Sequence, residues 1–192
     1  AKDAPLRITY GRDVLPALIA NFLFYGQRWV IQSVWGEGQF EEIEKIYFSN
    51  EDPPNGTIIT NYLGTASQTV DPTLVGAFQS TRQVNYTDTH NDVAYSVISV
   101  PSLSQMPTIT AVVKGLKVYD PRTDTVAYST NPALCLADFL VNERYGCGQP
   151  VVWSTVAAAA DYCDELVDGK KRREIGVSFT TRQDVSNIIE AL

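Results

Sequence analysis

The feature that most constrains the fold of this chain is a change in residue pattern near residue 119. From Leu6 to about Val118, short runs rich in Val, Ile, Tyr, Phe and Trp alternate with Gly, Pro, Asn and Asp, a pattern typical of strands and turns. Beyond it, apolar residues recur at helical spacing. The sequence therefore predicts an α+β fold. Residues 1–118 form a predominantly antiparallel β domain, barrel-like or sandwich-like, and residues 119–192 form a helical α/β lobe.

The β part contains one clear hairpin. Residues 17–25 and 28–35 are two strand-like runs joined by Gly26-Gln27, a link of the length that tight hairpins use. The second run carries apolar residues on both of its alternating faces, which predicts a central strand. The strand pattern then continues to Phe48 and stops at residues 50–56, where two prolines and a glycine predict a loop.

The rest of the β part is uneven. Residues 93–100 and 108–118 predict two further strands. Residues 57–92 are polar, and we expect loops there around one or two short elements.

The second part predicts two or three helices. Asn131-Pro132 supplies a cap residue followed by proline in the first turn, and Tyr145-Gly146 is a plausible stop. A second helix is expected over residues 154–167, ending before Gly169. A strand at residues 175–179 and a third helix capped by Asp184 complete the lobe, which we expect to be cut at its C-terminus.

Composition excludes several function classes. The net charge is −7 and the basic residues are scattered, apart from Lys170 to Arg173, which argues against nucleic-acid binding as the main task. The longest apolar stretch, Val14 to Tyr25, is shorter than the roughly 20 residues that span a bilayer. Three dispersed cysteines, Cys135, Cys147 and Cys163, predict reduced thiols rather than a disulfide framework.

Signals for catalysis, metals and cofactors are weak. His90 is the only histidine, and we interpret it as a solvated loop residue because no Gly-x-Ser-x-Gly elbow is present. Asp88, His90 and Asp92 resemble alternating ligands, but a polar turn is the favoured interpretation because the EF-hand glycine and glutamate are missing. Gly36-Glu37-Gly38 predicts a tight turn, not a phosphate cradle. We therefore assign no catalytic, cofactor-binding or metal-binding residue and expect no cofactor.

Two alternatives stay open. Asp161, Asp164 and Glu165 cluster in the second expected helix and supply the carboxylates that glycoside hydrolysis needs, although such a cluster is more often a solvated helix face. Trp29, Trp35 and Trp153 are candidates for stacking on sugars, although aromatic residues in strand runs are more often core. The residue pattern favours a structural or binding role over an enzyme.

Several motifs in the second part recur in one known family. Residues 113–148 read VKGLKVYDPRTDTVAYSTNPALCLADFLVNERYGCG, and residues 157–165 read AAAADYCDE. These two stretches resemble the tail tip proteins of long-tailed bacteriophages. That family includes tip attachment and host-specificity proteins and the similar hub proteins of prophages and gene transfer agents. Tyr10-Gly11-Arg12 and Gly36-Glu37-Gly38 fit the resemblance less sharply and would extend it over nearly the whole chain.

These motifs are markers of the fold rather than catalytic residues. The residues Asp-Pro-Arg-Thr favour a turn, and Ser-x-Asn-Pro-Ala favours the start of a helix. Asp124 departs from the family, which usually has glycine there, but aspartate tolerates a left-handed conformation, so the turn is expected to survive. Cys147 departs from the aliphatic or small residue that is common at its position.

The resemblance implies a role in the virion. A tail hub is generally a ring of three copies that closes the tail tube and carries the central fibre or receptor-binding regions. The chain would be an N-terminal fragment of such a homotrimer, made in the bacterial cytoplasm, located in the virion tail and in contact with other tail tip and tail tube proteins. The alternatives are a virion-associated enzyme that degrades the cell wall and a module that binds a carbohydrate or receptor.

Overall fold

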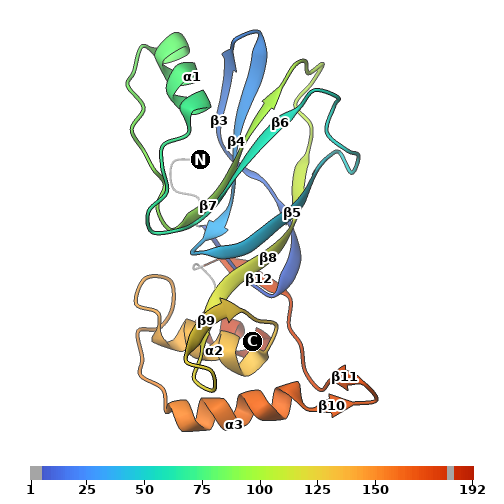
Figure 1. The fold of residues 1–192 in the computed structure, drawn as a ribbon, viewed down its shortest axis with the longest axis vertical. Helices are drawn as coiled ribbons and strands as arrows, with labels where there is room; N and C mark the ends of the chain where they lie inside the picture. Colours follow the sequence, from blue (N-terminus) through green and yellow to red (C-terminus); the bar gives the residue numbers. More distant parts are fainter. Residues whose placement is uncertain (1–5, 181–183) are drawn as a thin grey trace. The chain divides into compact units, whose positions relative to one another are not determined.

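The fold is α+β with mostly antiparallel sheets, as the sequence predicts. The computed structural model describes residues 6–180 and 184–192 (Figure 1). The chain divides into two compact units. Among the described residues, unit 1 consists of residues 14–113, and unit 2 consists of residues 6–13 and the residues from 114 onward. That residues 1–118 and 119–192 form separate domains stays a prediction.

Unit 1 is built around a four-stranded antiparallel sheet with the order β3-β4-β7-β6 (Figure 1). Its strands are β3 (Leu18–Tyr25), β4 (Arg28–Glu37), β7 (Val93–Val100) and β6 (Ile58–Leu63). The expected hairpin joins β3 to β4 through Gly26 and Gln27, which both have positive φ. That pair of left-handed residues matches the twist of the flanking strands. The central position predicted for β4 is confirmed, because β4 is buried on both faces.

A second sheet has the order β2-β8-β5, and β9 pairs with the far end of β8. Its strands are β2 (Arg12–Pro16), β5 (Phe40–Phe48), β8 (Ile109–Asp120) and β9 (Thr125–Tyr128). The barrel form of the prediction is wrong, since the sheets stay open and the fold contains no closed barrel. The hydrogen-bonded order of the first sheet ends at β3 and β6 instead of joining them.

The polar region between residues 57 and 92 holds β6 and an 11-residue helix, α1 (Pro72–Arg82). The expected number of one or two elements is confirmed among the described residues, but the residue pattern did not predict that one of them is a helix. Its start has a clear signal: the Asp71 side chain accepts a hydrogen bond from the Leu74 amide, and Pro72 follows directly. The same carboxylate accepts a hydrogen bond from Tyr62 Oη at 3.0 Å, which ties the helix cap to β6.

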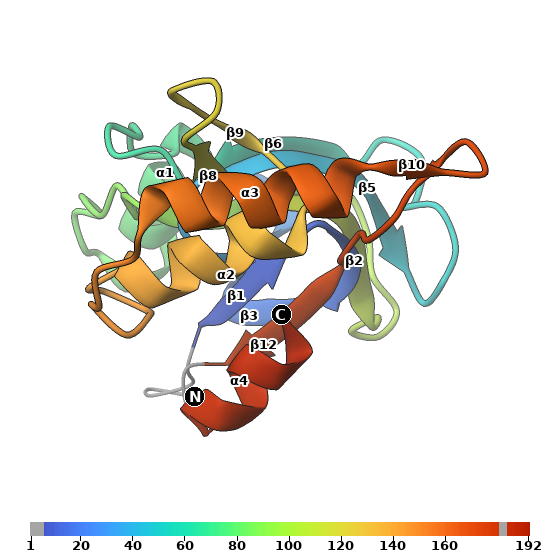
Figure 2. The same cartoon turned by 90° about the horizontal axis from the view of Figure 1, so that it is seen from below.

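Unit 2 combines a two-stranded sheet with three helices and a small hairpin. Its elements are β1 (Arg7–Tyr10), β12 (Val177–Thr180), α2 (Pro132–Val141), α3 (Trp153–Asp164), β10 (Leu166–Val167), β11 (Lys170–Lys171) and α4 (Val185–Ala191). Strands β1 and β12 pair antiparallel, although about 170 residues separate them in the chain. Helices α2 and α3 lie side by side (Figure 2).

Two predicted helix ends are wrong. Helix α2 ends at Val141 rather than at Tyr145-Gly146, because the Asn142 side chain accepts hydrogen bonds from the next amides and turns the chain. Helix α3 ends at Asp164, because Leu166–Val167 pair with β11 instead of continuing the helix. The predicted starts at Asn131-Pro132 and Asp184 are confirmed. None of the helices in the described part of the chain is long and apolar enough to cross a membrane.

The Asp71 cap provides a test of how unit 1 is held together. We expect Asp71→Ala to lower the free energy of unfolding by about 1–3 kcal/mol, because a helix cap and a buried acceptor are both lost. Asp71→Asn keeps an acceptor for the helix amide and should recover most of the loss. Asp184→Ala is the matched control, since Asp184 caps α4 without a side-chain hydrogen bond. Chemical denaturation of the three variants measures the effect, and equal losses in both alanine variants would contradict it.

Candidate functional site

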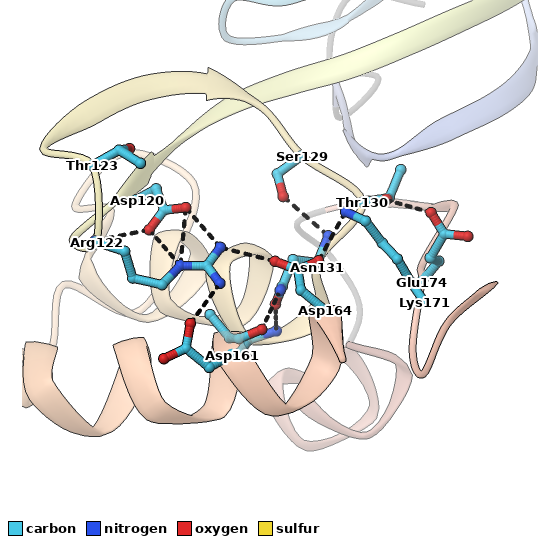
Figure 3. A network of polar contacts seen from close by, with 12 residues as sticks. Asp120, Arg122, Thr123, Ser129, Thr130, Asn131, Asp161, Asp164, Lys171 and Glu174 are labelled. Atoms are coloured by element: carbon cyan, nitrogen blue, oxygen red, sulfur yellow. Dashed lines mark hydrogen bonds and ion pairs between the residues drawn. The ribbon is translucent and has the colours of Figure 1, made fainter. Parts of the chain in front are cut away.

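The motifs that carry the family resemblance meet at one guanidinium group, that of Arg122 (Figure 3). Its Nε and Nη2 atoms donate to the Asp120 carboxylate at 2.9 and 2.8 Å. Nη1 donates to Asp161 at 3.1 Å, and Nη2 also donates to Asp164 at 2.9 Å. One arginine in the β8–β9 turn therefore binds its own turn and two residues of α3. We call Asp120, Arg122, Asp161 and Asp164 the Arg122 cluster.

The turn that presents Arg122 is fixed by its own side chains. Asp120 accepts a hydrogen bond from the Arg122 amide, in addition to those from the guanidinium. Asp124 adopts a φ of 54°, in the left-handed region, and accepts a hydrogen bond from Tyr119 Oη at 3.0 Å. The expectation that the turn survives with aspartate in a left-handed conformation at this position is confirmed.

The contacts of the cluster favour the ionised forms of Asp120 and Asp164. Hydrogen bonds from Arg122 hold the pKa of Asp120 below its usual value. Burial alone raises the pKa of Asp164, but hydrogen bonds from Lys171, Arg122 and Asn131 outweigh that effect and leave it lowered. The Lys171 ammonium lies 2.8 Å from Asp164. The hydrogen bond with Asp120, followed by those with Asp164 and Asp161, raises the pKa of Arg122.

This geometry does not suit glycoside hydrolysis. A general acid that works near neutral pH needs a raised pKa, whereas that of Asp164 is lowered. Asp161 is exposed and Glu165 is paired with Arg172 at 2.6 Å. The interpretation of all three acids as a merely solvated face is also wrong for Asp164, whose side chain is only 25% exposed because it accepts these bonds.

Asn131 extends the network from α3 to α2. It is fully buried, and its Oδ1 accepts a hydrogen bond from the Ala133 amide at the start of α2. Its Nδ2 donates to the Ala160 carbonyl of α3 at 2.9 Å. The Ser129 hydroxyl in turn accepts the Asn131 amide. The Ser-x-Asn-Pro-Ala motif thus starts one helix and fastens it to the next.

A second cluster surrounds Asp138 on the same unit. Asp138 Oδ2 accepts hydrogen bonds from Tyr10 Oη at 2.6 Å and from Tyr145 Oη at 2.8 Å. Burial raises the pKa of Asp138, and the two tyrosine bonds offset only part of that effect. Tyr10 and Tyr145 both belong to motifs of the resemblance. They join β1 and the segment after α2 to the helix itself.

Two motif glycines allow the backbone to pass closely. A Cβ added at Gly115 would lie 2.1 Å from the Thr9 carbonyl oxygen, and one at Gly146 would lie 1.9 Å from that of Phe139. Any side chain at either position would displace neighbouring backbone. These glycines, like the two clusters, serve the internal packing of unit 2.

The remaining candidate residues contact neighbouring side chains, although Trp153 is 37% exposed. Trp35 is buried and donates to Ser96 Oγ, Trp29 is half-buried and stacks on Phe22, and Trp153 packs edge-on against Tyr119. His90 is half-buried rather than solvated, because its ring packs against Tyr95 and is hydrogen-bonded to Tyr86. Its surroundings lower its pKa, chiefly by burial.

The structure also shows where the candidate metal ligands, the Gly36–Gly38 turn and the three cysteines lie. Asp88, His90 and Asp92 form no metal-ligand group, and none occurs elsewhere among the described residues. Gly38 lies in the tight turn after β4, with a φ of 86°. All three cysteines are free thiols, and burial raises the pKa of Cys135 to about 12.

The residue pattern did not predict that Arg122 contacts α3. Each motif has a local explanation, and the contacts of Arg122 with Asp161 and Asp164 cross 39 and 42 residues. The available signal was an arginine in a turn together with unpaired acids in a later helix.

Replacement of Arg122 tests the cluster. We expect Arg122→Ala to lower the free energy of unfolding by about 1–3 kcal/mol, because three neighbouring carboxylates lose their shared cation while partly exposed to solvent. Arg122→Lys should recover only part, since an ammonium cannot bind bidentately. Arg173→Ala is the matched control, an exposed arginine of the same unit. Denaturation curves give the three values.

The pH dependence of that loss follows from the lowered pKa values of Asp120 and Asp164. A carboxyl with a lowered folded pKa stabilises the fold above its unfolded pKa of about 3.9, and this contribution disappears as pH falls through the folded pKa. The difference between the native chain and Arg122→Ala should therefore shrink below about pH 4. A difference that stays constant to pH 2 would contradict the ion-pair assignment.

Asp138 should show the opposite pH dependence. A raised folded pKa stabilises the fold below about pH 3.9, and the contribution is lost as pH rises through the folded pKa. Asp138→Asn keeps an acceptor for both tyrosines and removes the charge, so its stability relative to the native chain should rise between pH 4 and 8. Asp138→Leu should be destabilised throughout by about 1–3 kcal/mol, since two tyrosine hydroxyls lose their acceptor. Thermal unfolding across this pH range measures both.

The chain has a structural likeness to a known virion protein. No family model matches the chain, and no curated protein matches it. Among solved structures, the chain is similar to a protein of the virion of a native gene transfer agent particle, with a TM-score of 0.46 and 15% sequence identity. The similarity covers 60% of this chain and 27% of that one.

Proposed function

We propose that this chain is a structural component of the tail tip or baseplate hub of a phage or prophage. In this role it helps to close the tail tube and connects it to the central fibre or receptor-binding region. It acts in the virion tail, as part of a homotrimer that contacts other tail tip and tail tube proteins. It performs no catalysis there.

One observation supports the proposal above all others. The residues that resemble tail tip proteins, which lie in separate segments of the sequence, meet in the Arg122 cluster, at Asn131 and around Asp138. Their bonds are directed at other parts of unit 2. A motif whose members hold the fold together is expected of a structural protein, in which the same unit is repeated in a ring.

The two alternative functions receive less support from the geometry. A wall-degrading enzyme would need a carboxyl group kept protonated, but the pKa of Asp120 and that of Asp164 are lowered. A sugar-binding module built on the tryptophans would need free ring faces, but Trp35 is buried and Trp29 stacks on Phe22. That leaves Trp153, which is 37% exposed and packs edge-on against Tyr119.

The location is tested by quantitative mass spectrometry of gradient-purified particles from an induced culture. Peptides of this chain should occur at a low, fixed ratio to the major tail tube protein, as expected for a single terminal ring. Their absence from intact tailed particles would overturn the proposed location.

The role of the fold is tested in the same particles. With the full-length gene carrying Arg122→Ala, we expect a large loss of tailed, infectious particles, because the hub subunit fails to assemble. The Arg173→Ala variant should give particles at the native level. Normal particle yield from an Arg122→Ala variant that is measurably unfolded would show that the chain is dispensable for assembly.

A further inference from the structure

The two edges of the main sheet in unit 1 carry no charged side chains, and β3 has a register shift between Ile19 and Asn21 as its one protective feature. Strands β3 and β6 lie at the ends of the order β3-β4-β7-β6. No charged residue occurs from Val14 to Gln27, which contains β3, or from Pro53 to Val70, which contains β6. Natural edge strands are commonly kept apart by charged side chains, proline or bulges.

The end strands of the other sheet do carry charged residues, which hinder pairing with another chain. Strand β5, an edge of the order β2-β8-β5, carries Glu41, Glu42, Glu44 and Lys45. Strand β2, the opposite edge, carries Arg12, Asp13 and Pro16. Among the four strands that end these two sheet orders, β3 and β6 are the pair without a charged residue.

Strand β3 exposes large aromatic side chains on one face. Phe22 is 40% exposed and Phe24 is 49% exposed. Helix α1 covers the opposite face, where Leu23 is buried and the Tyr25 ring approaches Gly76. Farther into the sheet this same face is covered, since Ile31 and Ile98 are fully buried, and at the β3 edge the rings of Phe22 and Phe24 both pack against the half-buried Trp29.

Strand β6 lies beside a groove on the corresponding face. Ile59 shares a face of the sheet with Phe22, through Ile98 of β7 and Ile31 of β4. The groove, of about 370 Å³, is bounded on this side by Ile59 and Asn61 and on the other by Ile43 and Ile46 of β5. One edge thus offers protruding rings, and the other offers a partly apolar groove.

The directions of the two strands complete the match. Each neighbouring pair in the sheet is antiparallel, so β3 and β6 run in opposite directions. In a ring whose axis follows the strands, β3 of one copy therefore meets β6 of the next copy antiparallel, with a regular ladder of hydrogen bonds.

We propose that β3 of one copy pairs with β6 of a second copy of this chain, with Phe22 and Phe24 facing the groove beside Ile59. The contact is head-to-tail, so each copy uses both edges, and a closed ring leaves neither β3 nor β6 as a free edge. This inference deepens the proposed function and relies on it for the closure of the ring at three copies.

Paired cysteines test the contact in the full-length protein within purified particles. Ile59→Cys is combined in turn with Phe22→Cys or Phe24→Cys, which covers two registers two residues apart on the regular part of β3. Mild oxidation should link copies of at least one double variant into covalent dimers and closed trimers on a non-reducing gel. Each single variant should give none, and neither should Ile59→Cys combined with Val126→Cys, an exposed valine of β9.

The outcomes separate this inference from the proposed function. Cross-linked trimers support the β3–β6 contact. Covalent dimers from a single β3 variant would show that β3 pairs with itself, which overturns it. Particles that contain the protein but give no cross-link also overturn it, while the tail location stands. If particles lack the protein, the location fails, and the same double variants in the concentrated, purified full-length protein decide the contact.

Discussion

The guanidinium of Arg122 is the contact on which unit 2 depends. It is bound bidentately by Asp120 and singly by Asp161 and Asp164, so one planar cation satisfies three carboxylates. Arginine is suited to this position because its fork of donors is rigid and stays charged. The β8–β9 turn, α3 and, through Asn131, the start of α2 are all placed by this group. A local turn motif thereby becomes a tertiary contact.

The carboxyl groups near Arg122 and that of Asp138 have pKa values shifted in opposite directions. Near Arg122 the acids are surrounded by cations and their pKa values fall, whereas Asp138 is buried with two neutral tyrosines and its pKa rises. The first arrangement stabilises the fold in its charged form, and the second favours a protonated acid. The first contribution is lost as pH falls below about 4 and the second is lost as pH rises above it, so the two together favour maximal stability of unit 2 near pH 4.

The sequence predicts those elements correctly whose structure is determined by residues close together in the chain. The β3–β4 hairpin follows from Gly26-Gln27 and two alternating runs, and α2 starts at Asn131-Pro132 as expected. Helix α1 was missed because polar residues hid its short buried face, although Asp71-Pro72 marked its start. The ends of α2 and α3 were misplaced because they are set by the Asn142 side chain and by strand pairing. The Arg122 cluster joins residues about 40 positions apart, and no local pattern encodes such a distance.

The burial of Cys135 affects how its thiol reacts. Only the thiolate reacts readily with oxidants and disulfides. With a pKa of about 12, the Cys135 thiol is ionised in only about one molecule in 10⁵ at neutral pH. Its reaction with oxidants is slowed accordingly, and burial also keeps those reagents away. If the chain acts in a virion, as we propose, this free thiol is therefore protected in an oxidising environment without a disulfide partner.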